Sequence, residues 1–186
     1  MKPEMYNEEA KMLDQKQKDY YRQEAMKYFN DAKIVLTPEE QDKLEFADFG
    51  LGEMDQTGLI LITYVNTSKV CAKELVLLPG MTCPEHRHPD IGSADGKEET
   101  FRCRAGKVFL YVEGEPTANP QAKPPKGREQ NYTVWHEIIL EPGQQYTLSP
   151  NTKHWFQGGP EGAIVSEFST TSRDDKDIFT DPEISR

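Results

Sequence analysis

The sequence has no long hydrophobic run. Its apolar stretches, such as residues 59–62, are only a few residues long, whereas a helix needs about 20 apolar residues to cross a bilayer. The first residues, MKPE, are followed by further acidic residues and lack the apolar segment of a secretory signal peptide. We therefore expect a cytoplasmic protein with no membrane partner.

Cysteine is scarce as well. The three cysteines, Cys71, Cys83 and Cys103, cannot all pair with one another, and no two of them have Cys-x-x-Cys spacing. A small, odd number of cysteines is typical of proteins in a reducing compartment. The cysteines therefore agree with a cytoplasmic location and predict no disulfide framework.

Basic residues are fewer than acidic ones. The sequence has 22 Lys and Arg and 32 Asp and Glu, which gives a formal net charge of −10. Nucleic-acid-binding proteins need clustered basic side chains to displace counterions from phosphates. This composition excludes a DNA- or RNA-binding function. The length of 186 residues corresponds to one domain, at roughly 150 residues per domain, and is long enough to bury a hydrophobic core.

Residues 1–45 are predicted to form a helical N-terminal extension that packs on the rest of the chain. Residues 16–30 contain neither proline nor glycine and carry several apolar side chains. A second helix is predicted to start at Thr37, which can cap it, with Pro38 in the first turn and Glu40 three residues after the cap.

Residues 46–186 are predicted to form a single all-β domain. Short segments rich in β-branched and aromatic residues alternate with turn sequences, and no helical pattern separates them. These segments lie at residues 59–65, 70–78, 107–112, 138–140 and 164–165. The spacing favours an antiparallel sandwich or barrel. Residues 114–131 are rich in proline, glycine and polar residues and are predicted to form a long hairpin loop.

Two of the four histidines, His86 and His88, are spaced to lie on one side of a strand, because strand side chains alternate with a period of two. Neighbouring imidazoles together with an acidic oxygen bind first-row divalent metals. A His-x-His pair also occurs by chance at structural or exposed positions, so the residues downstream decide between the two interpretations.

Alternation distinguishes two adjacent acids downstream. Glu99 shares one face of the expected strand with Phe101 and Cys103, whereas Glu98 shares the opposite face with Thr100. The interior of a barrel takes the apolar face, so Glu99 is predicted to be an inward metal ligand and Glu98 to be solvated. The alternative, a surface carboxylate on an edge strand, requires Phe101 and Cys103 to be exposed as well.

The fourth predicted ligand is His154. A single histidine beside a tryptophan, here Trp155, is more often a packing residue. In this sequence, however, it completes a set of three histidines and one carboxylate that leaves open positions on an octahedral metal. We therefore predict that His154 is a ligand, whereas His136 lacks such spacing and is predicted to be an ordinary strand residue.

The order Gly80, His86, His88, Glu99, Gly106 resembles the first motif of the cupin superfamily. The resemblance implies a single jelly-roll β-barrel. The sequence departs from the motif in the ten residues that separate the second histidine from the glutamate, since the family has a shorter spacer there. We expect a bulged loop near the metal at this point.

The chain is similar, more specifically, to the small D-lyxose isomerases. The similarity covers about residues 35–182 and rests on the segments ADFGLG, CPEHRHP, EETFRCRAGKV, NTKHWFQ and VSEFSTTSRDDKDIFTDP. It implies a homodimeric aldose–ketose isomerase that converts D-lyxose to D-xylulose and, more slowly, D-mannose to D-fructose. The implied cofactor is Mn²⁺, with Co²⁺ or Fe²⁺ in its place as open alternatives.

Aldose–ketose isomerisation moves hydrogen between C2 and C1, by hydride shift or through an enediol, and the enediol route needs a metal and a base at carbon. The resemblance places Lys73 in the substrate cavity, where it would neutralise enediolate charge, and Glu167 as the base on the last strand. Trp155 is predicted to stack on the sugar. For Lys73, the alternative is a lysine at the end of a strand whose amine reaches water. For Glu167 it is a surface position, and for Trp155 it is packing that closes the barrel.

Two other functions stay open at this point. A mononuclear iron dioxygenase can use the same set of three histidines and one glutamate, and a non-enzymatic cupin would bind sugar around a structural metal. The acidic residues that follow Arg173 are interpreted as a solvated face or a lid.

Overall fold

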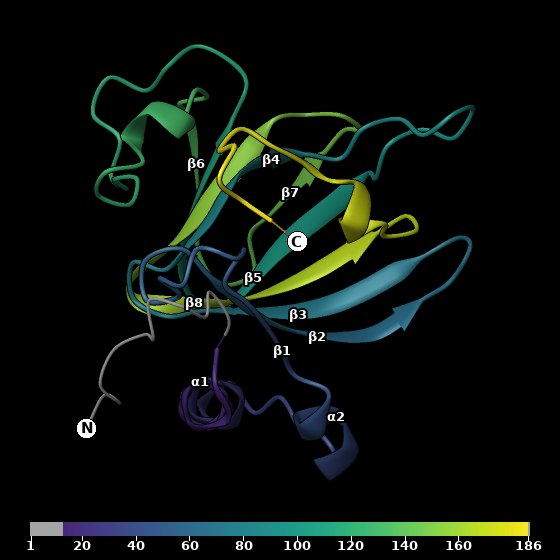
Figure 1. Ribbon diagram of the computed structural model, residues 1–186, viewed down its shortest axis with the longest axis vertical. Coiled ribbons are helices and arrows are strands. Elements are labelled where there is room, and N and C mark those ends of the chain that lie inside the picture. The colour runs from purple at the N-terminus through teal and green to yellow at the C-terminus, as the bar shows by residue number, and fades with distance from the viewer. Residues whose placement is uncertain (1–12, 186) are drawn as a thin grey trace.

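The computed structural model describes residues 13–185 and shows a mostly β protein with its two α-helices on one side (Figure 1). The helical elements are α1 (Gln15–Asp31), α2 (Pro38–Asp42), η1 (Glu129–Asn131) and η2 (Asp174–Lys176). The strands are β1 (Glu45–Ala47), β2 (Leu59–Asn66), β3 (Cys71–Leu77), β4 (Thr82–Arg87), β5 (Glu99–Val112), β6 (His136–Leu140), β7 (Gln145–Leu148), β8 (His154–Ser169) and β9 (Ile178–Phe179). The predicted all-β class is confirmed. No helix in the described part of the chain is long and apolar enough to cross a membrane.

The two helices begin at side chains that cap them. Asp14 accepts a hydrogen bond from the Gln17 amide at 2.8 Å, and the Gln17 side chain accepts one from the Asp14 amide at 2.9 Å. Thr37 and Glu40 form the same reciprocal capping box at the start of α2, as the sequence predicts. Residues 1–12 of the predicted extension lie outside the described residues.

Helix α1 packs on the sheet through one face. Its Tyr21, Ala25 and Phe29 are four residues apart, a spacing that aligns side chains along a helix. All three belong to the same hydrophobic core cluster as the sheet residues. The predicted boundary after residue 45 falls at the start of β1, and the division of the chain at that point stays a prediction because both parts share one core.

The nine strands form one curled sheet, and the two long strands β5 and β8 connect its halves. The path runs β1-β2-β3-β8-β4-β9, while β5 pairs with β6, β7 and β8. The first half of β8 pairs with β4 and its second half pairs with β3. The first half of β5 likewise pairs with β7 and its second half with β6. Because β5 and β8 belong to both halves of the sheet, the halves curl towards one another (Figure 1).

The curl occurs where β5 and β8 pass two glycines. The φ angles of Gly106 and Gly162 are 71° and 74°, in a region that residues with a side chain rarely adopt. A Cβ atom on Gly106 would lie 2.1 Å from the carbonyl oxygen of Gly162. The pairing register shifts at this point, as at a β-bulge that bends a strand. The second glycine of the cupin-like motif therefore has a steric role.

The predicted hairpin loop is present and is anchored to the C-terminal segment. It connects β5 to β6, whose pairing begins at Val112 and His136. Arg128 in the loop forms ion pairs with Glu53 and with Asp181, the latter at 2.8 Å. The ion pair with Asp181 therefore holds the C-terminal segment against the loop.

The packing of α1 on the sheet gives a first prediction. Phe29 is fully buried, so Phe29→Ala is expected to lower the free energy of unfolding by about 3–5 kcal/mol, measured by urea denaturation. Phe168→Ala is the control, because 49% of Phe168 is exposed, and it is expected to change stability by less than about 1 kcal/mol. Equal effects of the two substitutions would contradict the packing of α1 described above.

Candidate metal centre and active site

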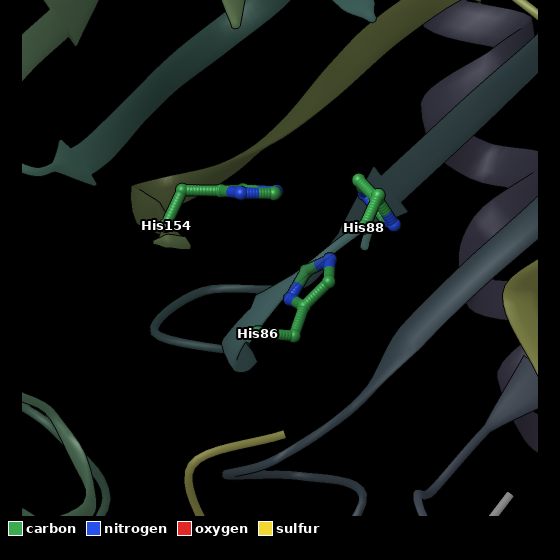
Figure 2. A group of neighbouring side chains, drawn as sticks. All are labelled: His86, His88 and His154. Atoms are coloured by element: carbon green, nitrogen blue, oxygen red, sulfur yellow. The ribbon is translucent and has the colours of Figure 1, made fainter. Parts of the chain in front are cut away.

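Three histidines from two paired strands meet inside the barrel. His86 lies on β4, His88 directly follows this strand, and His154 begins β8, where it pairs with His86. Their ligand atoms all lie within 4.8 Å of one another, and all three side chains are buried. Figure 2 shows the three imidazole rings converging from these neighbouring strands. The predicted three-histidine group is therefore present and can hold a metal ion.

The orientation of each ring is set at its Nδ1 atom. In His86 and His154, Nδ1 contacts the backbone carbonyl oxygen two residues earlier, at 2.7 and 3.0 Å. In His88, Nδ1 lies 2.5 Å from Oδ1 of Asp177. Since carbonyl and carboxylate oxygens only accept hydrogen bonds, Nδ1 carries the proton in each ring. The Nε2 atoms are therefore the metal-binding atoms.

Glu99 lies at the centre of this group. Its Oε1 is 3.0 Å from Nε2 of His88 and 3.0 Å from Nε2 of His154. Two ligands at ~2.1 Å from an octahedral metal, at right angles, lie about 3.0 Å apart. Nε2 of His154 is buried and has no hydrogen-bond partner in the described part of the chain. The distances and this unpartnered nitrogen fit a divalent metal ion.

The pKa values of His86 and Glu99 agree with this fit, whereas that of His88 describes a ring from which a metal would displace a proton. Burial keeps the pKa of His86 well below its ordinary value, so this imidazole is neutral, as a metal ligand must be. Burial opposes a charge on Glu99, but Lys97 and His88 hold the pKa of Glu99 well below its ordinary value. Burial also works against a charge on His88, but Glu99 and Asp177 raise the pKa of His88 to about 9.

A second group of charged side chains faces the histidines. Nζ of Lys97 is 2.7 Å from Oε2 of Glu99 and 3.0 Å from Oε1 of Glu167. Nζ of Lys73 is 2.8 Å from Oδ2 of Asp174 and 3.7 Å from Oε1 of Glu167. Burial lowers the pKa of both lysines, but the neighbouring carboxylates outweigh it. Glu99 and Glu167 raise the pKa of Lys97, and Glu167 raises the pKa of Lys73. Both lysines therefore stay charged at neutral pH.

The two groups border one cavity of about 30 Å³, which is room for about one or two water-sized groups. Charged side chains line one part of the cavity and apolar side chains the rest. The apolar wall includes Phe49, Leu59, Leu61, Phe101, Phe156 and Phe179. The lining therefore combines the charged groups of the site with an apolar wall.

The structure brings six of the seven residues predicted for the site to this cavity or its metal group. Glu99 is 1% exposed and Glu98 is on the solvent side, so the strand alternation is confirmed. Lys73 is 5% exposed and Glu167 4%, which rules out the surface positions considered for them. Their chemical roles stay predictions.

Trp155 is the exception. It lies on the opposite side of β8 from the histidine group, and its ring stacks on Tyr111 with centroids 4.0 Å apart. Its indole nitrogen donates to the Val134 carbonyl oxygen at 2.8 Å. Trp155 does not line the cavity, so the predicted stacking on a sugar is corrected to packing beneath the long loop. His136 lies on β6 outside the three-histidine group, as predicted.

The sequence prediction missed three residues of the site. Lys97 comes from the expected bulged loop. It lies two residues before Glu99 and therefore on the same side of the chain, and this spacing was visible in the sequence. Asp174 and Asp177 come from the acidic C-terminal segment. Their interpretation as a solvated face is wrong, because both contact buried partners, whereas the neighbouring Asp175 is exposed.

Comparison with known proteins gives a family. The sequence matches the D-lyxose isomerase family over residues 18–186. It is 67% identical over 155 residues to a D-lyxose/D-mannose isomerase of Thermosediminibacter oceani, covering 83% of this chain and 86% of that one. It is 64% identical over 165 residues to a D-lyxose ketol-isomerase of Cohnella laeviribosi, covering 89% and 91%.

Solved structures show the same fold. The L-ribose isomerase of Acinetobacter sp. DL28, in complex with L-ribose, superposes with a TM-score of 0.76 at 17% identity, covering 94% of this chain and 95% of that one. The L-ribose isomerase of Cellulomonas parahominis with L-ribose gives a TM-score of 0.73 at 17% identity, covering 94% and 96%. At such identity the likeness concerns the fold alone. The sequence match over most of the chain shows that it belongs to the D-lyxose isomerase family.

Proposed function

We propose that the protein is a metal-dependent isomerase that interconverts D-lyxose and D-xylulose, and also D-mannose and D-fructose. The observation that carries this proposal is the cavity itself, which joins a group suited to a divalent metal with a buried carboxylate between two lysines. The relatives at 67% and 64% identity are named as isomerases of these sugars. An iron dioxygenase and a non-enzymatic sugar-binding protein are therefore not favoured.

The metal would be held by His86, His88, Glu99 and His154. Imidazole and carboxylate ligands suit Mn²⁺, and they also suit Co²⁺ and Fe²⁺, which stay alternatives. When bound, the metal supplies a Lewis acid that polarises the oxygen atoms on C1 and C2 of the sugar.

Glu167 is the proposed base of the enediol route. Its contacts with Lys97, Lys73 and Ser169 all involve Oε1, and no contact of Oε2 is seen within residues 13–185. Oε2 would take the proton from C2 of the aldose and return it to C1, while the proton of the C2 hydroxyl passes to the C1 oxygen. The net result is a ketose with no atom gained or lost.

The two lysines support this proton transfer by charge. Because both are held as ammonium groups by carboxylates, they cannot act as bases themselves. Their ammonium groups can donate hydrogen bonds to a sugar oxygen on which negative charge develops, and their positive charge stabilises that negative charge. The apolar wall keeps water from the same region, which strengthens these electrostatic interactions.

A homodimer and a cytoplasmic location complete the proposal. The homodimer follows from the sequence resemblance and the cytoplasmic location from the sparse cysteines, and the protein's partner in the reaction is a small sugar. These two points stay predictions.

The activity is tested first on the wild-type protein. With Mn²⁺ added under anaerobic conditions, incubation with D-lyxose is expected to form D-xylulose, detected by a ketose assay and by chromatography. No oxygen is needed, because the reaction is redox-neutral overall. Failure of the Mn²⁺-loaded protein to form any ketose from a panel of aldoses would contradict the proposed activity.

The metal ligands are tested by His88→Ala. This variant is expected to lose both bound metal and activity, because a neutral imidazole is removed from the centre. Metal content is measured by elemental analysis of the purified protein. His136→Ala is the control, since His136 lies outside the histidine group, and it is expected to keep both properties.

The base is tested by Glu167→Gln. We expect this variant to bind metal normally and to lose turnover by about 10²–10⁴-fold, the contribution of a positioned general base. Glu98→Gln changes an exposed acid that lies outside the cavity lining and is expected to keep wild-type turnover. Near-normal rates in Glu167→Gln would show that another group takes the proton.

A further inference from the structure

We propose that Asp177 is a positioning residue that couples the C-terminal segment, residues 174–181, to the metal centre through His88. The inference rests on the proposed function in one respect, namely that the histidine and glutamate group binds a divalent metal. It adds a residue outside the ligand set and assigns a role to the acidic segment that the sequence left open.

The contact between Asp177 and His88 is direct and buried. Oδ1 of Asp177 lies 2.5 Å from Nδ1 of His88, and their side chains are 5% and 8% exposed. On the other side of the ring, Nε2 lies 3.0 Å from Oε1 of Glu99. By accepting a hydrogen bond from Nδ1–H, Asp177 keeps the lone pair of His88 on Nε2, towards the metal position, and makes this nitrogen a stronger ligand.

His88 depends on this partner more than the other two histidines do. The rings of His86 and His154 are oriented by backbone carbonyl oxygens two residues earlier in their own segments. The ring of His88 is oriented by a side chain that lies 89 residues away in the sequence. His88 also follows the last residue of β4 and so lies beyond the regular part of the strand.

The C-terminal segment is attached to the site on both sides of Asp177. Before it, Asp174 forms an ion pair with the buried Lys73 at 2.8 Å. After it, Phe179 pairs with His86, and the Thr180 hydroxyl donates to Oε1 of the buried Glu85 at 2.6 Å. Asp177 is thus held between two attachments that both end on residues of the metal centre or its cavity.

This arrangement has a consequence for metal binding. If the segment holds the His88 ring, then metal bound at Nε2 must in turn stabilise the packing of the segment, because coupling between two sites is reciprocal. The loss of a carboxylate partner of a metal-bound histidine typically costs 10–100-fold in metal affinity. A residue that served only to stabilise the fold would leave this affinity unchanged.

The test compares Mn²⁺ affinity in three proteins at one pH. Titration of the metal-free wild type, Asp177→Ala and Asp175→Ala by chelator competition is expected to show a 10–100-fold higher Kd in Asp177→Ala only. Asp175 is the matched control, because it lies in the same segment but is exposed and pairs only with the neighbouring Lys176. Asp177→Asn, which keeps the shape and an acceptor oxygen but not the charge, is expected to give a smaller loss and remains usable if the alanine variant does not fold.

A second measurement follows the segment itself. Addition of Mn²⁺ to the wild type is expected to slow amide hydrogen exchange at residues 178–180, and this protection is expected to be lost in Asp177→Ala. Wild-type Mn²⁺ affinity in Asp177→Ala and Asp177→Asn would overturn the coupling while leaving the metal centre intact. A wild-type protein that binds no divalent metal would overturn both the coupling and the proposed function.

Discussion

The pairing of β8 with its neighbours is the constraint on which both the barrel and the site depend. Strand β8 contacts β3, β4 and β5, and it carries His154 at its start and Glu167 near its end. Because strand side chains alternate, these two residues would face opposite sides of a regular strand. The bend at Gly106 and Gly162, where the register of β5 and β8 shifts, brings both side chains to the same interior.

The site is built from charges that compensate one another. Lys73, Lys97, Glu99 and Glu167 are each at most 7% exposed, and removing such groups from water costs several kcal/mol per ion unless each has a partner. In this cavity every one of them contacts an opposite charge. The network therefore keeps Lys73 and Lys97 as ammonium groups and Glu99 as a carboxylate, next to the Glu167 carboxyl group that is proposed to move the proton.

The metal group was accessible to sequence reasoning because its determinants are local. His86 and His88 are two residues apart on one strand, and the apolar partners of Glu99 show which side of its strand faces inward. The prediction for Trp155 did not follow from this alternation and was wrong. Its place next to a ligand says only that it points to the opposite side of β8, where Tyr111 and the long loop cover it.

The sequence by itself determined the β class, the cap of the second helix, the candidate metal ligands and, through its resemblance to a family, the expected chemistry. These properties depend on periodicity and spacing over a few residues, which are physical properties of the local chain. The tertiary structure decided what fills the rest of the cavity. Asp174 and Asp177 reach Lys73 and His88 only because the last segment folds back over the open end of the barrel, and no local pattern distinguishes them from the exposed Asp175 between them.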